Sequence, residues 1–238
     1  MTMITKDFFD FLLPSKTIIN YRPKVRYDTN NVIFRNVILY GFQGSGKTSG
    51  VNYIVYKAIK KYGEENVNAR VSEDGNLSEL LSFGLRPVLV NILFSDNTTL
   101  RKISKEELLS YFRIRHLFKE RYGLSNGYIL SLIALHRFHS IPVELRTTID
   151  GIIVKDSSMN PYDRSILKKF IGDKVLQTIE KISVEREKKP ELKKLAYFVG
   201  RSISGFITLP LARENYLKPA FDLREFVEEL KKNKCSSS

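Results

Sequence analysis

Residues 36–54, with the sequence NVILYGFQGSGKTSGVNYI, place a glycine-rich loop between an apolar run and an apolar periodic stretch. The loop contains three glycines within six residues and is followed by Lys47 and Thr48. Glycine is the residue that a chain uses where its backbone has to turn sharply or approach another group closely. A strand, a tight loop and a helix in this order predict an α/β fold in which the loop holds a ligand.

The loop has the spacing G-x-x-x-x-G-K-[ST]. Glycines at the fixed positions let successive backbone N–H groups turn inward around phosphate oxygens, and the following helix points its positive end at the same charge. The lysine can reach the β- and γ-phosphates of a nucleotide, and the threonine hydroxyl can bind Mg²⁺. The strand and helix on either side favour this interpretation over a glycine-rich turn with an incidental lysine. The predicted nucleotide-binding residues are Gly41, Phe42, Gln43, Gly44, Ser45, Gly46, Lys47, Thr48 and Ser49.

Apolar β-rich runs alternate with helical patterns along the chain, which predicts a mostly parallel central sheet flanked by helices. Strands are expected at 32–40, 67–72, 86–99, 127–136, 150–156 and 205–210. Helices are expected at 47–61, 77–83, 104–122 and 222–234, with Ser104 as an N-cap, and 160–201 is a basic, helix-rich stretch. We expect an N-terminal extension (1–30), a core (31–156) and a helix-rich C-terminal part (157–238) that packs on the core.

The composition is that of an ordinary globular protein, with 42% hydrophobic and 27% charged residues among 238. The formal net charge of +13 suggests a polyanionic partner. One cysteine cannot form an internal disulfide, no apolar run is long enough to span a membrane, and the N-terminus lacks the features of a secretory signal. We therefore expect a soluble, cytoplasmic protein.

A phosphate loop does not by itself name a reaction. The N-K-x-D and T-K-x-D motifs with which GTPases recognise guanine are absent from the sequence. A small-molecule kinase would need an arginine-rich lid, and the basic stretch 164–194 is mostly lysine. An ATPase is the remaining class. Asp96, at the carboxyl end of an apolar strand, is the carboxylate expected beside a Mg²⁺ ion bound by Thr48, with a role in a turn or helix cap as the alternative.

The strand order resembles that of the additional-strand (ASCE) P-loop ATPases, since the strand 67–72 and its helix lie between the loop unit and the strand that carries Asp96. The segment SLIALHRFHSIPVELRTTIDGIIVKD, residues 131–156, resembles the FtsK/HerA branch, which includes viral genome-packaging and plasmid-transfer motors. The small DnaA-like ATPases of archaeal viruses and plasmids are a close competing match. The resemblance covers residues 32–156. It implies a P-loop NTPase fold, ATP and Mg²⁺ as ligands, a homo-oligomer, DNA as partner, and a viral or plasmid origin.

One departure from the family pattern concerns the activation of water. Asn97 stands where these ATPases usually have a catalytic glutamate. An asparagine can orient a water molecule but cannot take its proton. Fast hydrolysis would therefore need Glu106, Glu107 or a neighbouring subunit as a substitute.

The resemblance also implies roles for residues after the strand 127–136. His136 stands where the branch often has glutamine, and would sense the γ-phosphate; a histidine that caps a buried strand is the alternative. Arg137 or Arg146 could stabilise transition-state charge across a ring interface, whereas a solvated turn or a structural ion pair is the alternative for Arg146. The predicted catalytic residues are Lys47, Asp96, Asn97, His136 and Arg146.

Two basic stretches, 112–123 and 163–201, are candidates for contact with nucleic acid. Such surfaces neutralise phosphates and give salt-dependent binding that is largely independent of sequence. Solvated helix faces would explain each stretch equally well, and the net charge favours contact with DNA or RNA. The predicted nucleic-acid-binding residues are Arg113, Arg115, Lys119 and Arg121.

Three functions are compatible with these residues. The first is an oligomeric ATPase that translocates, packages, replicates or remodels DNA. The second is a nucleotide-gated DNA-binding switch with little or no hydrolysis, which Asn97 favours. The third is a small-molecule kinase, against which the net charge argues.

Overall fold

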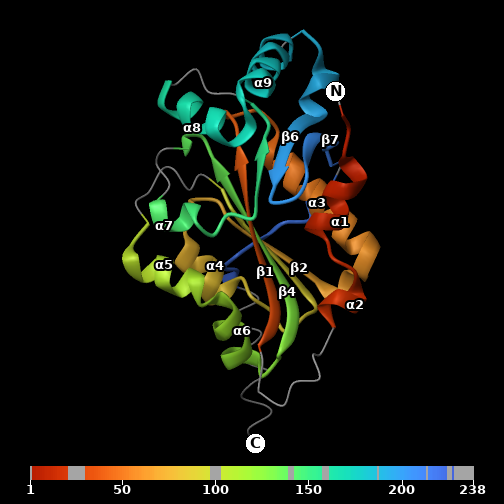
Figure 1. The fold of residues 1–238 in the computed structure, drawn as a ribbon. Helices are drawn as coiled ribbons and strands as arrows, with labels where there is room; N and C mark the ends of the chain where they lie inside the picture. The colour runs from red at the N-terminus through yellow and green to blue at the C-terminus, as the bar shows by residue number, and fades with distance from the viewer. Residues whose placement is uncertain are drawn as a thin grey trace, which may run out of the picture.

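The computed structural model of the chain describes residues 2–20, 30–96, 103–138, 142–156, 161–186, 188–212, 214–223 and 227. In this part of the chain one sheet of eight strands has the order β7-β6-β5-β1-β4-β3-β2-β8 (Figure 1). Its strands are β1 (Asn31–Tyr40), β2 (Val67–Ser72), β3 (Val90–Ser95), β4 (Asn126–Leu135), β5 (Gly151–Val154), β6 (Leu195–Gly200), β7 (Ser204–Thr208) and β8 (Lys218–Pro219).

The sheet is mostly parallel, which confirms the predicted fold class. β1 lies at its centre and pairs in parallel with β4 and β5, and β2, β3, β4 and β8 continue the parallel part. β6 and β7 are added antiparallel beyond β5. One strand, β4, separates the strand before the glycine loop from β3. The carboxyl ends of the parallel strands therefore meet at one edge, where ligands of open α/β sheets bind.

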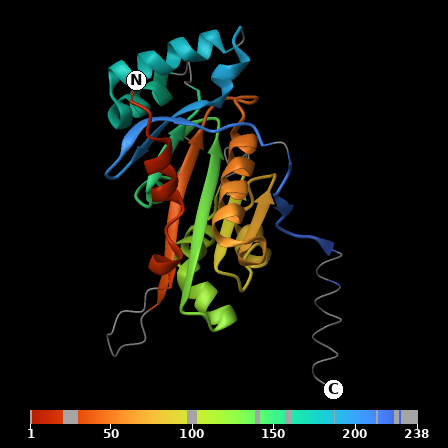
Figure 2. The ribbon, with the colours of Figure 1, turned by 90° about the vertical axis from the view of Figure 1, so that its right-hand side faces the viewer.

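Helices cover both faces of the sheet (Figures 1 and 2). The helices are α1 (Thr5–Leu12), α2 (Lys16–Ile19), α3 (Lys47–Tyr62), α4 (Leu77–Phe83), α5 (Lys105–Phe112), α6 (Ile114–Tyr122), α7 (Val143–Arg146), α8 (Pro161–Ile171) and α9 (Asp173–Glu185), with short 3₁₀ helices at Glu64–Asn66 and Pro190–Lys194. Helices α1 to α3 pack on one face, and α4, α5, α6, α8 and α9 contribute to the core on the other.

The alternation of side chains along β1 explains the two cores. Val37 and Leu39 belong to the core under α1 to α3, whereas Ile38 and Tyr40 belong to the core under α4 to α9. Successive side chains of a strand point to opposite faces, so a strand covered on both faces is apolar throughout. This burial fixes the end of β1, and with it the start of the glycine loop.

The helix predicted at 104–122 is two helices, which corrects that prediction. The chain turns at Arg113, whose φ of −90° and ψ of 6° are not helical, and this break lets α6 direct Ile114 and Phe118 into the core. The predicted N-cap is confirmed, because Ser104 accepts from the backbone N–H of Glu107 and the Glu107 carboxylate accepts from that of Ser104. The carboxylate of Glu107 is therefore used in a capping box.

The prediction that the chain is helix-rich to about residue 201 is wrong for its last part, where β6 forms. Tyr197 faces one core and Phe198 the other, the alternation typical of a strand with two covered faces. β6 pairs with β5 and β7, and the β7 residue Phe206 in turn accepts a backbone hydrogen bond from Ile4. The predicted terminal helix at 222–234 lies outside the described residues except for 222, 223 and 227.

Within the described ranges, no helix combines the length and the apolar character that a membrane crossing requires.

Candidate phosphate-binding site

The loop between β1 and α3 has a backbone that requires its glycines. Gly44 and Gly46 have φ values of +78° and +79°, in the left-handed region that favours glycine. A Cβ atom on Gly41 would lie 2.8 Å from Ser45 Oγ and 3.3 Å from the backbone nitrogen of Asp156. The motif glycines are thus explained by backbone conformation at Gly44 and Gly46 and by close approach at Gly41.

The loop presents hydrogen-bond donors at the start of α3. The first helical bond runs from Gly50 N to Gly46 O, at 3.0 Å. The backbone N–H groups that precede Gly50 in the first turn have no acceptor within the helix. Ser45 Oγ is buried and has no hydrogen-bond partner among the described residues. A buried hydroxyl without a partner and a set of helix N-terminal donors fit an anion such as a phosphate group.

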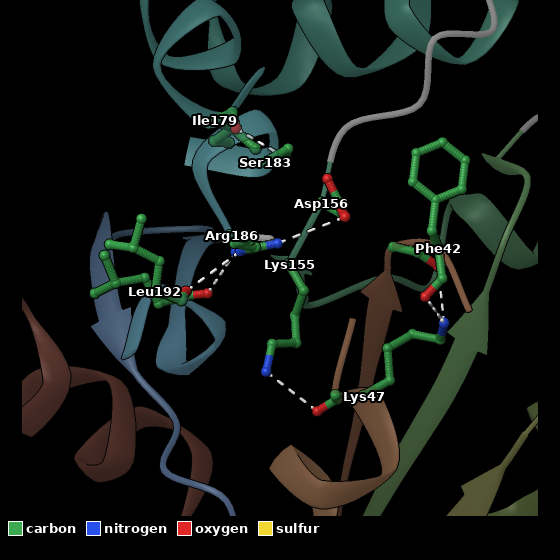
Figure 3. A network of polar contacts seen from close by, with 11 residues as sticks. Phe42, Lys47, Lys155, Asp156, Ile179, Ser183, Arg186 and Leu192 are labelled. Carbon is green, nitrogen blue, oxygen red and sulfur yellow. Dashed lines mark hydrogen bonds and ion pairs between the residues drawn. The ribbon is translucent and has the colours of Figure 1, made fainter. Parts of the chain in front are cut away.

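Lys47 lies in the loop with its ammonium group almost buried. Its Nζ donates to the carbonyl oxygen of Phe42, at 2.9 Å (Figure 3), and to that of Gly41, at 2.8 Å. It also lies 3.4 Å from Nδ1 of His136. Burial lowers the pKa of Lys47 to about 8, against the opposing effect of Asp96 and Asp156. Burial and the charge of Lys47 also lower the pKa of His136, which keeps its ring neutral at pH 7. Phosphate oxygens would be stronger acceptors for Lys47 than these neutral carbonyls.

The hydroxyl of Thr48 donates to Oδ2 of Asp96, at 3.1 Å. Asp96 follows β3, so a carboxylate and a hydroxyl from separate elements lie beside the loop. No group of three or more metal-ligating side chains occurs in the described part of the chain. Mg²⁺ characteristically takes one or two protein ligands and completes its shell with phosphate oxygens and water, so Thr48 and Asp96 fit such an ion beside a nucleotide.

The remaining predicted residues are placed in different ways. Asn97 lies outside the described residues. Arg146 ends α7, in the connection between β4 and β5, and its role stays a prediction. The predicted nucleic-acid-binding cations belong to α6 or, for Arg113, directly precede it, and α6 lies at the opposite end of the sheet from the loop (Figure 1). Of these, Arg121 donates to the carbonyl oxygens of residues 81 and 82, and Arg113 lies 3.5 Å from Glu120.

Three charged residues without a predicted role also lie at the loop end of the sheet (Figure 3). Lys155 is fully buried, and its Nζ donates to Gly46 O at 3.1 Å. Asp156 Oδ2 lies 3.7 Å from Nη1 of Arg186, which is itself buried and whose pKa burial lowers. Lys155 and Asp156 directly follow the apolar strand β5, the same signal that singled out Asp96 after β3.

We expect the affinity of the chain for a non-hydrolysable ATP analogue to fall as the pH rises above about 8, the pKa of Lys47. Phosphates attract the protonated lysine, so binding must supply a proton above that pH, at a cost of up to roughly tenfold per pH unit. Isothermal titration calorimetry between pH 6.5 and 9.5 measures this. Lys47→Arg, which stays charged throughout, is the control and should show a shallower profile. A pH-independent affinity in the native chain would contradict the role of Lys47.

Comparison with known proteins gives similarity in structure only. No protein-family model and no curated protein matches the chain. A solved structure of the genome packaging NTPase B204 from Sulfolobus turreted icosahedral virus 2, in complex with ATP-gammaS, is 12% identical with a TM-score of 0.48, over 75% of this chain and 98% of that chain.

Two further solved structures are similar to the chain. The pCW3 conjugation coupling protein TcpA is 10% identical with a TM-score of 0.41, over 83% of this chain and 65% of that chain. The N-terminal domain of zonular occludens toxin from Neisseria meningitidis is 10% identical with a TM-score of 0.42, over 77% and 97%. At 10–12% identity these similarities concern the fold of the chain.

Proposed function

We propose that the chain binds ATP with Mg²⁺ at the loop 41–49, hydrolyses it, and uses the cycle to act on DNA as a homo-oligomer. The observation that carries the proposal is that three groups lie close together at the start of α3. These are the buried ammonium of Lys47, the Thr48–Asp96 hydrogen bond of 3.1 Å, and the helix N-terminus. A cation, a metal-binding pair and backbone donors are the parts that phosphoryl transfer requires.

In this proposal the residues position the phosphates and stabilise charge. Lys47 and the N–H groups of the loop hold the β- and γ-phosphates, and Thr48 and Asp96 hold the metal. When bound, Mg²⁺ neutralises charge on the phosphate oxygens. His136, 3.4 Å from the Lys47 ammonium, lies within reach of the same phosphates as a hydrogen-bonding sensor. Hydrolysis is then the attack of an oriented water without a covalent intermediate of the enzyme.

The activation of that water distinguishes the motor from the switch. Asn97 can orient a water molecule but cannot accept its proton. Of the glutamates considered as substitutes, Glu107 has its carboxylate in the capping box of α5. This observation favours, as the second candidate, a nucleotide-gated switch with slow turnover, unless a partner subunit supplies the base. An arginine such as Arg137 or Arg146 acting across a subunit interface would serve the transition state in either case.

Contact with DNA is proposed for Arg113 and for the cations of α6. Arg113 and Arg115 are exposed and Lys119 is half-buried, whereas the guanidinium of Arg121 already donates to backbone carbonyls. The net charge of +13 provides a general attraction for a polyanion. These features support a surface that binds phosphates without reading sequence.

The test is steady-state ATP hydrolysis with and without double- and single-stranded DNA. We expect DNA to stimulate hydrolysis by the native chain, and we expect a variant with Arg113, Arg115 and Lys119 changed to Glu to lose this stimulation while keeping its basal rate. The control is a variant with Lys6, Lys57 and Lys60 changed to Glu, on the opposite face of the sheet. It should keep most of the stimulation by DNA. Tight ATP binding with negligible turnover in every condition would establish the switch instead, and turnover that needs a small-molecule acceptor would establish a kinase.

A further inference from the structure

Lys155 is a buried cation that has no carboxylate partner in the described part of the chain. Its side chain is fully buried, and its ammonium group donates to one carbonyl, that of Gly46, at 3.1 Å. Among the described residues no acidic side chain forms an ion pair with it. Burying a charge is costly unless it is paired and hydrogen-bonded, so a chain tolerates such a lysine only where something compensates it.

The surroundings of Lys155 are short of negative charge. Burial, then the charges of Arg186 and Lys47, lower the pKa of Lys155 to about 8. Its ammonium also lies at the N-terminal end of α3, where the helix dipole is positive. Asp156, the next residue on the same segment, faces Arg186. A polyphosphate above the loop would supply the negative charge that the protein itself does not.

The contact with Gly46 has a direct effect on the loop. The carbonyl of Gly46 and the N–H of Lys47 belong to one peptide unit, and in a trans peptide these groups point in opposite directions. Lys155 and the backbone N–H of Gly50 both donate to this carbonyl, at 3.1 and 3.0 Å, so together they keep the N–H of Lys47 turned toward the other side, where phosphate binds in such loops. A Cβ on Gly46 would lie 3.3 Å from Lys155 Nζ, and one on Gly50 3.9 Å from it. The two glycines therefore leave the space that this ammonium occupies.

The segment that carries Lys155 is itself anchored. Asp156 lies 3.7 Å from the guanidinium of Arg186, at the end of α9, and Arg186 also donates to the carbonyl oxygens of Leu192 and Leu195 (Figure 3). Tyr40, the last residue of β1, donates a hydrogen bond to the fully buried Asp163 of α8 at 3.3 Å. Polar contacts thus join the ends of β1 and β5, which flank the loop, to the C-terminal helices α8 and α9.

We propose, on the basis of the function proposed above, that Lys155 is a positioning residue of the phosphate loop, which it holds through Gly46 in the form that binds nucleotide. Lys155 acts through the loop backbone and needs no contact with the phosphates. The anion bound above the loop stabilises the buried charge in return. Nucleotide binding and the protonation of Lys155 are therefore coupled.

The experiment compares the native chain with Lys155→Met, which keeps the length of the side chain and removes its charge. The probe is a non-hydrolysable ATP analogue with Mg²⁺. We expect binding at least about tenfold weaker, because the loop loses the charged hydrogen bond that holds Gly46 and the bound anion loses a nearby positive charge. We expect an unchanged or higher Tm, because an uncompensated buried charge has been removed. If Lys155 had a purely structural role, its replacement would lower both the affinity for the analogue and the Tm. Lys181→Met, at an exposed site on α9, is the matched control and should change neither.

Proton uptake gives a second readout. Calorimetry at pH 8 in buffers of different ionisation enthalpy should show that the native chain takes up protons on binding and that Lys155→Met takes up fewer. Lys155→Arg, which does not titrate, should take up fewer protons while it still binds, and it decides the question if Lys155→Met does not fold. Native affinity and native proton uptake in the variants would overturn the role of Lys155 alone. A native chain that binds no analogue would overturn the nucleotide site and this role with it.

Discussion

We expect the Lys47→Ala variant to bind ATP with Mg²⁺ at least about 100-fold more weakly than the native chain and to show no hydrolysis above background. This expectation follows from the position of the Lys47 ammonium, which is almost buried and donates to the loop carbonyls of Gly41 and Phe42. In such a site a phosphate would lose a charge-assisted hydrogen bond that water cannot replace. Binding is measured by calorimetry with an ATP analogue, and turnover by release of phosphate.

The fold of this variant should be unaffected, because the substitution removes a buried cation and leaves no buried charge in its place. Thermal unfolding checks this point. Lys60→Ala, an exposed position on the same helix, is the control and should retain native binding. Retained hydrolysis in folded Lys47→Ala would show that nucleotide is held somewhere else.

The second large effect is expected from Asp96→Asn. The amide oxygen can still accept from the Thr48 hydroxyl, as the carboxylate does at 3.1 Å, so the local structure is preserved while the negative charge is lost. We expect the Mg²⁺ concentration that gives half-maximal turnover to rise by roughly 10- to 100-fold. Turnover measured over a series of Mg²⁺ concentrations at fixed ATP tests this expectation.

The matched control is Asp7→Asn, an exposed carboxylate in the first turn of α1. It makes the same change of charge far from Thr48 and should leave the requirement for Mg²⁺ unchanged. An unaltered Mg²⁺ dependence in Asp96→Asn would mean that Asp96 has the turn or capping role of a strand-end aspartate.

The fold class follows from short-range patterns in the sequence. The strand 67–72 and the helix 77–83 were predicted with the bounds that the structure has. In the helix the apolar periodicity agrees with the burial of Leu77, Leu80 and Leu81. The glycine loop could be located for a similar reason, since the left-handed conformations of Gly44 and Gly46 are a property of those residues. The functional roles assigned to the loop residues stay predictions.

The parts that were missed depend on contacts between distant segments. Nothing in the sequence marks a break at Arg113, which has neither glycine nor proline beside it, and only the packing of α6 explains the turn there. The strand β6 follows a long basic helical stretch and is specified by pairing with β5. Arg186 meets Asp156 only after α8 and α9 have folded back on the sheet. Hydrophobic periodicity carries no information about contacts between segments that are distant in the sequence.

The pairing of β1 with β4 runs over ten consecutive positions, from Asn31 opposite Asn126 to Tyr40 opposite Leu135. At the usual rise of a strand this doubled rod is roughly 30 Å long, so a 5° tilt started at its loop end displaces its far end by about 2.5 Å. The rod carries the phosphate loop at one end and α6 at the other (Figure 1). Under the function proposed above, a tilt of this pair started by nucleotide at the loop would therefore also displace α6.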